Sequence, residues 1–142
     1  MFDLGNYLPY LINRAGVRVA AKFTQDVKPR DVTIQDWRVL AALNAYGPQR
    51  MSALADLTSI DRTTLTRLVT RMETSGLVTR TRAEDDGREV HVGLSARGAE
   101  AAAGIIPLAE RYERIALDGF SPDEAIALKA MLKRVYANFE KL

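Results

Sequence analysis

The sequence predicts a mainly α-helical fold with six helices and one small β-hairpin. Two observations carry this prediction. Apolar residues recur at helical spacing in six segments, which capping residues, glycine or proline separate. Strand-like alternation occupies residues 77–82 and 89–94, and Asp85-Asp86-Gly87 between them supplies a tight turn. A chain of 142 residues, 47% of them apolar, is long enough for one domain with its own core.

The composition excludes several kinds of functional site. The chain has no cysteine, which rules out disulfides, thiolate zinc sites and thiol redox switches. Its single histidine, His91, makes a histidine-rich metal site hard to build, and we expect it to be a surface residue of the hairpin. The net charge of +2 excludes a histone-like polycation but allows a local cationic face. We expect no metal and no cofactor.

Hydropathy and the N-terminal residues predict the cellular location of the protein. The opening segment carries an acid and no cationic region, so we expect no secretory signal. No run of about 18 uncharged apolar residues occurs, so we expect no contact with a membrane. Together these observations predict a cytoplasmic protein.

Capping residues set the limits of the first four helices. The first begins near Pro9 and runs to about Thr24. The box Thr33-Ile-Gln-Asp36 opens the second, and Gly47-Pro48 ends it. A short third helix, capped by Ser52, is expected to run through Leu57, and a fourth runs from a cap at Asp61 to Gly76. Two short helices, a tight turn and then a hairpin describe a winged helix-turn-helix.

The helices at the two ends of the chain are apolar on more than one face. Ser95 opens a fifth helix to about Leu117, and Ser121-Pro-Asp-Glu124 opens the sixth. Apolar residues crowd the N-terminus and the sixth helix: Phe2, Leu4, Tyr7, Leu8, Leu11, Ile12, Leu128, Met131, Leu132, Val135, Tyr136 and Phe139. An exposed apolar surface of this kind is expected to be buried against another surface, and we favour a second copy of the chain. The alternative is a monomer whose end helices fold back onto its own core.

The fourth helix has one apolar face and one face rich in threonine and arginine. Leu65, Leu68, Val69 and Met72 fall within one arc, and the opposite side carries Thr63, Thr64, Thr66, Arg67, Thr70 and Arg71. Short hydroxyl side chains suit close approach to phosphates and thymine methyl groups, and arginine suits the O6 and N7 atoms of guanine. The sequence therefore favours double-stranded DNA as a partner, over a merely exposed helix.

The hairpin adds further arginines. Arg80 and Arg82 share one strand face, and Arg88 directly follows the turn, where it could enter a minor groove. The alternative for Arg88 is a surface ion pair with Glu84, Asp85 or Asp86.

These segments resemble the MarR family of bacterial transcription regulators. The resemblance rests on Leu54-Ala-Asp-Leu57, Asp61-Arg-Thr-Thr-Leu-Thr-Arg-Leu-Val69, Gly76-Leu-Val-Thr-Arg80 and the wing signature Asp86-Gly-Arg88. It implies a single domain over residues 1–142, with a winged lobe at about 33–94 and dimerisation helices at about 8–25 and 95–140. It also implies a homodimeric repressor on a pseudo-palindromic operator, located at the nucleoid while bound.

The resemblance assigns roles to individual residues. Ser52 would meet a phosphate, Thr63, Thr64, Thr66 and Arg67 would face the major groove, and Arg88 would enter the minor groove. The chain departs from the family at two positions. Ser59 stands where many members have glycine, and Thr70 stands where many carry an acid, often linked to the wing arginine. How Arg88 is anchored is therefore left open.

The resemblance further implies release of DNA by a small aromatic or anionic effector. Its crevice would lie between the dimer helices and the winged lobe, with Tyr10, Arg14, Trp37 and Arg38 as candidate residues. These side chains could stack on a ring and neutralise a carboxylate. The alternative is a core position for Trp37 and a solvated or interface charge at Arg14.

The residues disfavour two other function classes. An enzyme is disfavoured because the only histidine lies on the hairpin and no glycine-rich phosphate loop occurs. A winged-helix dimer that binds only proteins remains the alternative reading, which the threonine and arginine face of the fourth helix disfavours.

Overall fold

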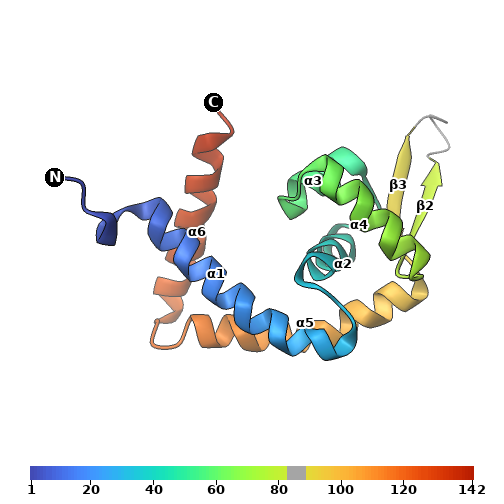
Figure 1. The fold of residues 1–142 in the computed structure, drawn as a ribbon. Helices are drawn as coiled ribbons and strands as arrows, with labels where there is room; N and C mark the ends of the chain where they lie inside the picture. Colours follow the sequence, from blue (N-terminus) through green and yellow to red (C-terminus); the bar gives the residue numbers. More distant parts are fainter. Residues whose placement is uncertain (83–88) are drawn as a thin grey trace. The chain divides into compact units, whose positions relative to one another are not determined.

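The computed structural model describes residues 1–82 and 89–142, and within them it confirms the mainly helical fold with a small sheet (Figure 1). The helices are α1 (Leu8–Val27), α2 (Ile34–Tyr46), α3 (Met51–Thr58), α4 (Arg62–Thr74), α5 (Ala96–Ala116) and α6 (Pro122–Phe139), with short 3-10 turns η1 (Leu4–Asn6) and η2 (Lys28–Arg30). The strands are β1 (Gln49–Arg50), β2 (Val78–Arg82) and β3 (Val90–Leu94). Two compact units, Met1–Ala109 and Glu110–Leu142, make up the chain.

Both predicted capping boxes are present. The backbone N–H of Asp36 donates to Thr33 Oγ1 at 3.1 Å, and Asp36 Oδ2 accepts the Thr33 N–H at 2.9 Å. The second box joins Ser121 and Glu124 through bonds of 3.1 and 2.9 Å. These contacts satisfy amide groups that the first helical turn leaves without a partner, which is why α2 and α6 begin where the sequence predicts.

The sheet contains a strand that the sequence did not predict. Its order is β1-β3-β2, all antiparallel, with Gln49 opposite Val92 and Arg50 opposite His91. A two-residue strand has no alternation to detect, which explains why β1 was missed. Because β1 leads directly into α3, the N-cap of that helix is Arg50, without a side-chain bond. The prediction that Ser52 caps α3 was therefore wrong.

The core of the first unit lies between α2, α3, α4, the sheet, the end of α1 and the start of α5. Its largest fully buried side chains include Leu40, Leu54, Leu65, Met72 and Ile105. All four residues predicted for the apolar face of α4 are buried, which confirms the helical phase on which the DNA hypothesis rests. Trp37 is only half-buried, with its ring centroid 5.9 Å from that of Phe23 on α1.

The start of α5 is tightly joined to the turn after α4. Ser95 Oγ accepts the N–H of Gly98 at 2.9 Å, which confirms Ser95 as the cap, and donates to the carbonyl of Gly76. Arg97 Nη1 donates to the carbonyl of Ser75 at 2.8 Å. A Cβ at Gly98 would collide with the carbonyl oxygen of Leu77. Glycine is therefore required where α5 crosses the backbone that leads into β2.

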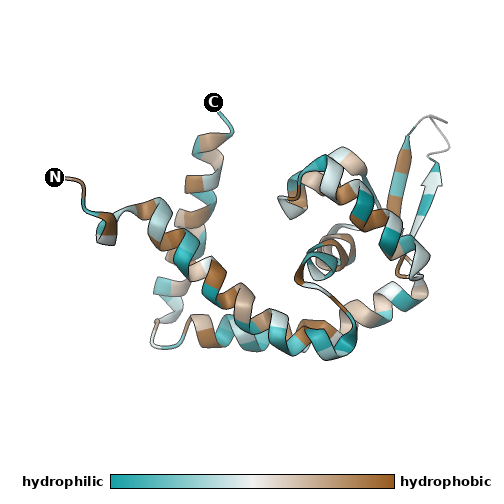
Figure 2. Ribbon diagram, in the orientation of Figure 1, coloured by the Kyte–Doolittle hydropathy of each residue, from teal (hydrophilic) through white to brown (hydrophobic). Residues whose placement is uncertain are grey.

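The second unit holds the end of α5 and all of α6. No residue of α6 is buried, and its apolar residues Met131 and Phe139 are exposed. Hydrophobic and hydrophilic segments, brown and teal, alternate along the ribbon of α6 (Figure 2). Lys129 Nζ on α6 pairs with Glu113 Oε1 on α5 at 2.6 Å. Among the helices of the described residues, none has the length and hydropathy of a membrane span.

Candidate nucleic-acid interface

The turn between α3 and α4 is tight and contains a strained residue. Ser59 has φ of +55°, the left-handed region that favours glycine, so the residue that departs from the family pattern occupies a position that needs this conformation. Asp61 then caps α4, because its Oδ1 accepts the Thr64 N–H at 3.0 Å and its Oδ2 accepts the Thr64 hydroxyl at 2.6 Å. The Thr64 hydroxyl, followed by its N–H, holds the pKa of the Asp61 carboxyl below its ordinary value.

The outward face of α4, which we define as Thr63, Thr66, Arg67 and Thr70, is exposed. Thr64, predicted to lie with them, is half-buried against its cap. The hydroxyl of Thr66 donates to the carbonyl of Arg62 at 2.8 Å, and that of Thr70 donates to the carbonyl of Thr66 at 2.9 Å. Since these hydroxyl hydrogens are used within the helix, both side chains present methyl groups and acceptor oxygens to a ligand.

Arg67 is the cation that this face offers to a ligand. Its side chain is exposed, and within the part of the chain that the structure describes it has neither a hydrogen bond nor an ion pair. A guanidinium held free on a short helix is suited to bidentate contact with a guanine edge.

Arg71 has a different environment. Its Nη2 lies 2.6 Å from Oδ1 of Asp36 on α2, and Nη1 lies 3.5 Å from Oδ2. The carboxylate is 1% exposed, whereas the arginine side chain is 52% exposed. Although Arg71 was predicted to contact DNA, its guanidinium is thus bonded to a neighbouring helix.

Arg80 is likewise bonded to α4. Its Nη2 donates to Thr70 Oγ1 at 2.8 Å and approaches the carbonyl of Thr66 at 3.5 Å. Strand β2 and helix α4, which run side by side in Figure 1, are therefore linked through Thr70. Arg82 is exposed further along the same strand. Arg88 and its predicted acidic partners lie outside the described residues.

The base of the wing carries a further ion pair. Arg50 Nε on β1 lies 2.9 Å from Glu89 Oε2, just before β3. His91, predicted to be a surface histidine, is half-buried, and its Nε2 is enclosed without a hydrogen bond in the described structure. Ser52 is exposed in the first turn of α3, where it is open to a phosphate.

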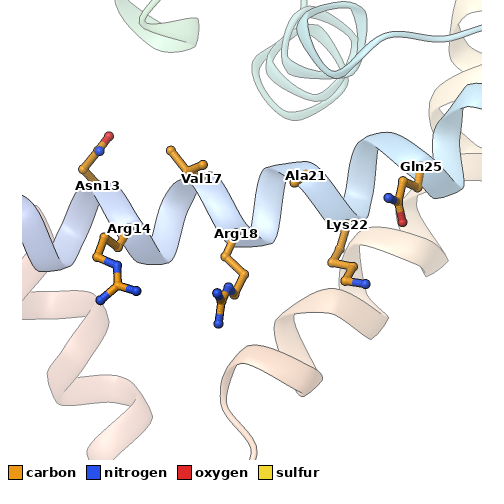
Figure 3. Close-up of a pocket in the computed structure, with 7 residues that line it drawn as sticks. All are labelled: Asn13, Arg14, Val17, Arg18, Ala21, Lys22 and Gln25. Carbon is orange, nitrogen blue, oxygen red and sulfur yellow. The ribbon is translucent and has the colours of Figure 1, made fainter.

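The four candidate effector residues do not share one groove of the first unit. Trp37 and Arg38 line a groove of about 400 Å³ between α2 and α3, together with Ala41, Ala42, Tyr46, Leu57 and Thr58. Arg14 lines another on α1, where Arg14, Arg18 and Lys22 point from the same side of the helix (Figure 3). The guanidinium of Arg14 lies 5.4 Å from the centre of the Tyr10 ring.

Sequence reasoning missed the structural importance of Asp36. Its carboxylate was explained by the capping box, and nothing local indicates a second partner 35 residues away. As for metals, the described residues contain no cluster of three histidine or acidic side chains that could hold an ion.

Comparison with known proteins identifies this arrangement. The model of the MarR family matches residues 32–90, which include α2, the α3–α4 pair and the wing up to the first residue of β3. The chain belongs to the MarR family. This agrees with the resemblance drawn from the segments 54–57, 61–69 and 76–80.

Three proteins are similar to this MarR-family chain over most of its length. The transcriptional repressor NicR of Pseudomonas putida is 25% identical over 134 residues, which are 94% of this chain and 85% of NicR. A MarR-family regulator from Silicibacter pomeroyi is 26% identical, with a TM-score of 0.86 over 96% of this chain and 92% of that one. BpsR of Bordetella bronchiseptica is 26% identical, with a TM-score of 0.81 over 91% of this chain and 98% of BpsR. The DNA binding of BpsR is regulated by 6-hydroxynicotinic acid.

These likenesses give the broad role of the protein. This MarR-family chain is a DNA-binding transcription regulator with a winged helix-turn-helix, and its named relatives are regulators rather than enzymes.

Proposed function

We propose that this MarR-family regulator is a cytoplasmic repressor that binds a pseudo-palindromic operator as a homodimer. The observation that carries this proposal is the exposed threonine and arginine face of α4 beside a wing strand. Thr63, Thr66 and Arg67 would read base edges in the major groove, and Ser52 would contact a phosphate. The helix that presents them is capped at its start and bonded to the wing through Thr70, so it is held in place before DNA arrives.

The homodimer is proposed from apolar side chains that the chain leaves exposed at both ends. Phe2 and Leu8 near the N-terminus are 70% and 51% exposed, and Ile126 and Phe139 on α6 are each 67% exposed. Apolar surface of this kind on both terminal segments favours burial against a second copy. Sedimentation of the full chain as a dimer of about twice 15.7 kDa supports this proposal, and a monomer at micromolar concentration contradicts it.

Operator binding can be tested by selection from random DNA. The wild-type protein is used to select duplexes from a random library, and the enriched duplex is then titrated by fluorescence anisotropy at several salt concentrations. We expect a two-fold related sequence, resistance to unrelated competitor DNA and a steep dependence on salt. Failure to enrich any sequence contradicts the proposal.

Arg67 gives the sharpest single test of base reading. Arg67→Ala should lose about 1–3 kcal/mol of binding free energy and relax discrimination at one base position in each half-site. Titration against every single-base variant of the selected duplex measures this. Equal losses on every sequence mean that Arg67 does not read a base.

We further propose that an aromatic acid occupies the groove lined by Trp37 and Arg38 and releases the operator. Trp37 and Tyr46 supply rings for stacking, Ala41 and Ala42 leave space for them, and Arg38 supplies a cation for a carboxylate. Regulation of the similar protein BpsR by 6-hydroxynicotinic acid supports this class of effector. The cationic groove on α1 lacks a tryptophan and is the less suited of the two.

Trp37 is the only tryptophan of the chain, so its fluorescence reports on this groove alone. Titration with 6-hydroxynicotinic acid should change that fluorescence and lower operator affinity in parallel. Arg38→Met should weaken both effects, whereas Arg14→Met, which alters the other groove, serves as the matched control. An acid that releases DNA equally well from the Arg38→Met variant argues against this site.

A further inference from the structure

An ion pair with a buried carboxylate joins α2 to α4. Asp36 is 1% exposed, and the Arg71 guanidinium reaches it with Nη2 at 2.6 Å from Oδ1 and Nη1 at 3.5 Å from Oδ2. Oδ2 also accepts the N–H of Thr33 at 2.9 Å, so both carboxylate oxygens have partners. An ionised carboxylate removed from water requires such partners, and the loss of one leaves a buried charge uncompensated.

The ion pair restrains α4, the helix proposed to read base edges. Arg71 follows Arg67 by four residues and so lies on the adjoining strip of the α4 surface. The planar guanidinium engages the carboxylate with two nitrogens, which restrains rotation of α4 about its axis more than a single contact would. That rotation sets where Thr63, Thr66 and Arg67 point.

We propose that Arg71 is a positioning residue rather than a DNA contact, and that with Asp36 it sets the angle at which α4 enters the major groove. This role rests on the proposed operator binding. The buried side chains of Leu65, Leu68, Val69 and Met72 hold α4 against the core, through a hydrophobic effect that is itself non-directional. The ion pair adds a directional restraint at the edge of that packing.

Two opposite expectations distinguish positioning from direct contact. If Arg71 positions α4, Asp36→Asn weakens operator binding, because the amide keeps the Thr33 cap but faces Arg71 with its NH₂ group. If Arg71 contacts DNA, Asp36→Asn frees its charge, and operator affinity stays the same or rises.

The experiment titrates the selected operator and an unrelated duplex against wild-type protein, Asp36→Asn, Arg71→Met and the double variant, at several salt concentrations. We expect the ratio of specific to non-specific affinity to fall about tenfold in each single variant and no further in the double variant, since both remove one interaction. The slope of log affinity against log salt should match that of the wild type, because no phosphate contact is lost.

Thr33→Ala is the matched control, because it removes the other half of the capping box and leaves the ion pair intact. Thr33→Ala should keep the wild-type ratio of specific to non-specific DNA affinity. If Arg71→Met does not fold, as monitored by its unfolding transition, Asp36→Asn and the double variant decide, since neither contains an unpaired buried carboxylate. If Arg71→Met lowers the magnitude of the slope of log affinity against log salt by about 0.9, the proposal is overturned, because that change signals one lost phosphate contact.

The outcomes also separate this role from operator binding itself. A wild-type protein that enriches no duplex overturns the proposed function and the positioning role together. Wild-type binding with an unchanged affinity ratio in Asp36→Asn overturns the positioning role alone.

Discussion

Arg80 Nη2 on strand β2 lies 2.8 Å from Thr70 Oγ1 on helix α4, so the wing and the helix proposed to read DNA are hydrogen bonded to each other. The structure shows the threonine hydroxyl accepting from the arginine while it donates to the carbonyl of Thr66. A neutral hydroxyl is a weaker acceptor for an arginine than a carboxylate, so this link is worth about one ordinary hydrogen bond.

Thr70→Val should therefore loosen the wing without changing the shape of the helix face. We expect about a three- to tenfold loss of operator affinity, the value of roughly one hydrogen bond. Thr74→Val is the matched control, because its hydroxyl bonds only to the carbonyl of Thr70 in the described structure. Anisotropy titrations measure both. If the loss caused by Thr70→Val persists in an Arg80→Met background, Thr70 acts on DNA directly and not through Arg80.

Ser59→Gly should stabilise the protein. Ser59 has φ of +55°, where a Cβ is strained and glycine is not, so the gain is about 0.5–1 kcal/mol after the larger chain entropy of glycine is deducted. Urea unfolding measures it. Ser59→Ala keeps the strain and should show no gain; equal stabilisation by alanine and glycine would exclude backbone strain as the cause.

Gly98→Ala should destabilise the protein by about 1–3 kcal/mol, because the added methyl group meets the carbonyl of Leu77 at the junction of β2 and α5. Gly16→Ala, in the open on helix α1, is the matched control and should be neutral or stabilising by up to about 1 kcal/mol. Thermal unfolding of both variants compares them. A mild effect at Gly98 would mean that α5 shifts freely at this junction.

Stability should depend on the ionisation of Asp61. Its pKa is lowered in the folded protein, so its charge stabilises the fold fully above the ordinary aspartate pKa of about 3.9. That contribution is lost as the pH falls through the lowered pKa of the folded state. Urea unfolding of wild type and Asp61→Asn at pH 6 and pH 3 should show a difference at pH 6 that shrinks at pH 3. A constant difference would assign the effect to the hydrogen bonds alone.

The sequence by itself determined the helices, most of their caps and the face that α4 turns outward. Asp61, the 33–36 box and the 121–124 box act on amides three residues away, so the information is local and can be read from residue order. The same holds for the buried face of α4, because helical periodicity alone sorts Leu65 and Met72 from Thr66 and Arg67.

Only the tertiary structure decided which of the predicted arginines are free to bind DNA. Arg71 is bonded to Asp36 and Arg80 to Thr70, across 35 and 10 residues, whereas Arg67 keeps an exposed guanidinium. The two-residue strand β1 and the need for glycine at residue 98 also come from packing. Arginine side chains are long and reach whichever carboxylate or hydroxyl the fold brings near. Their partners therefore depend on how separate helices and strands pack, which residue order does not encode locally.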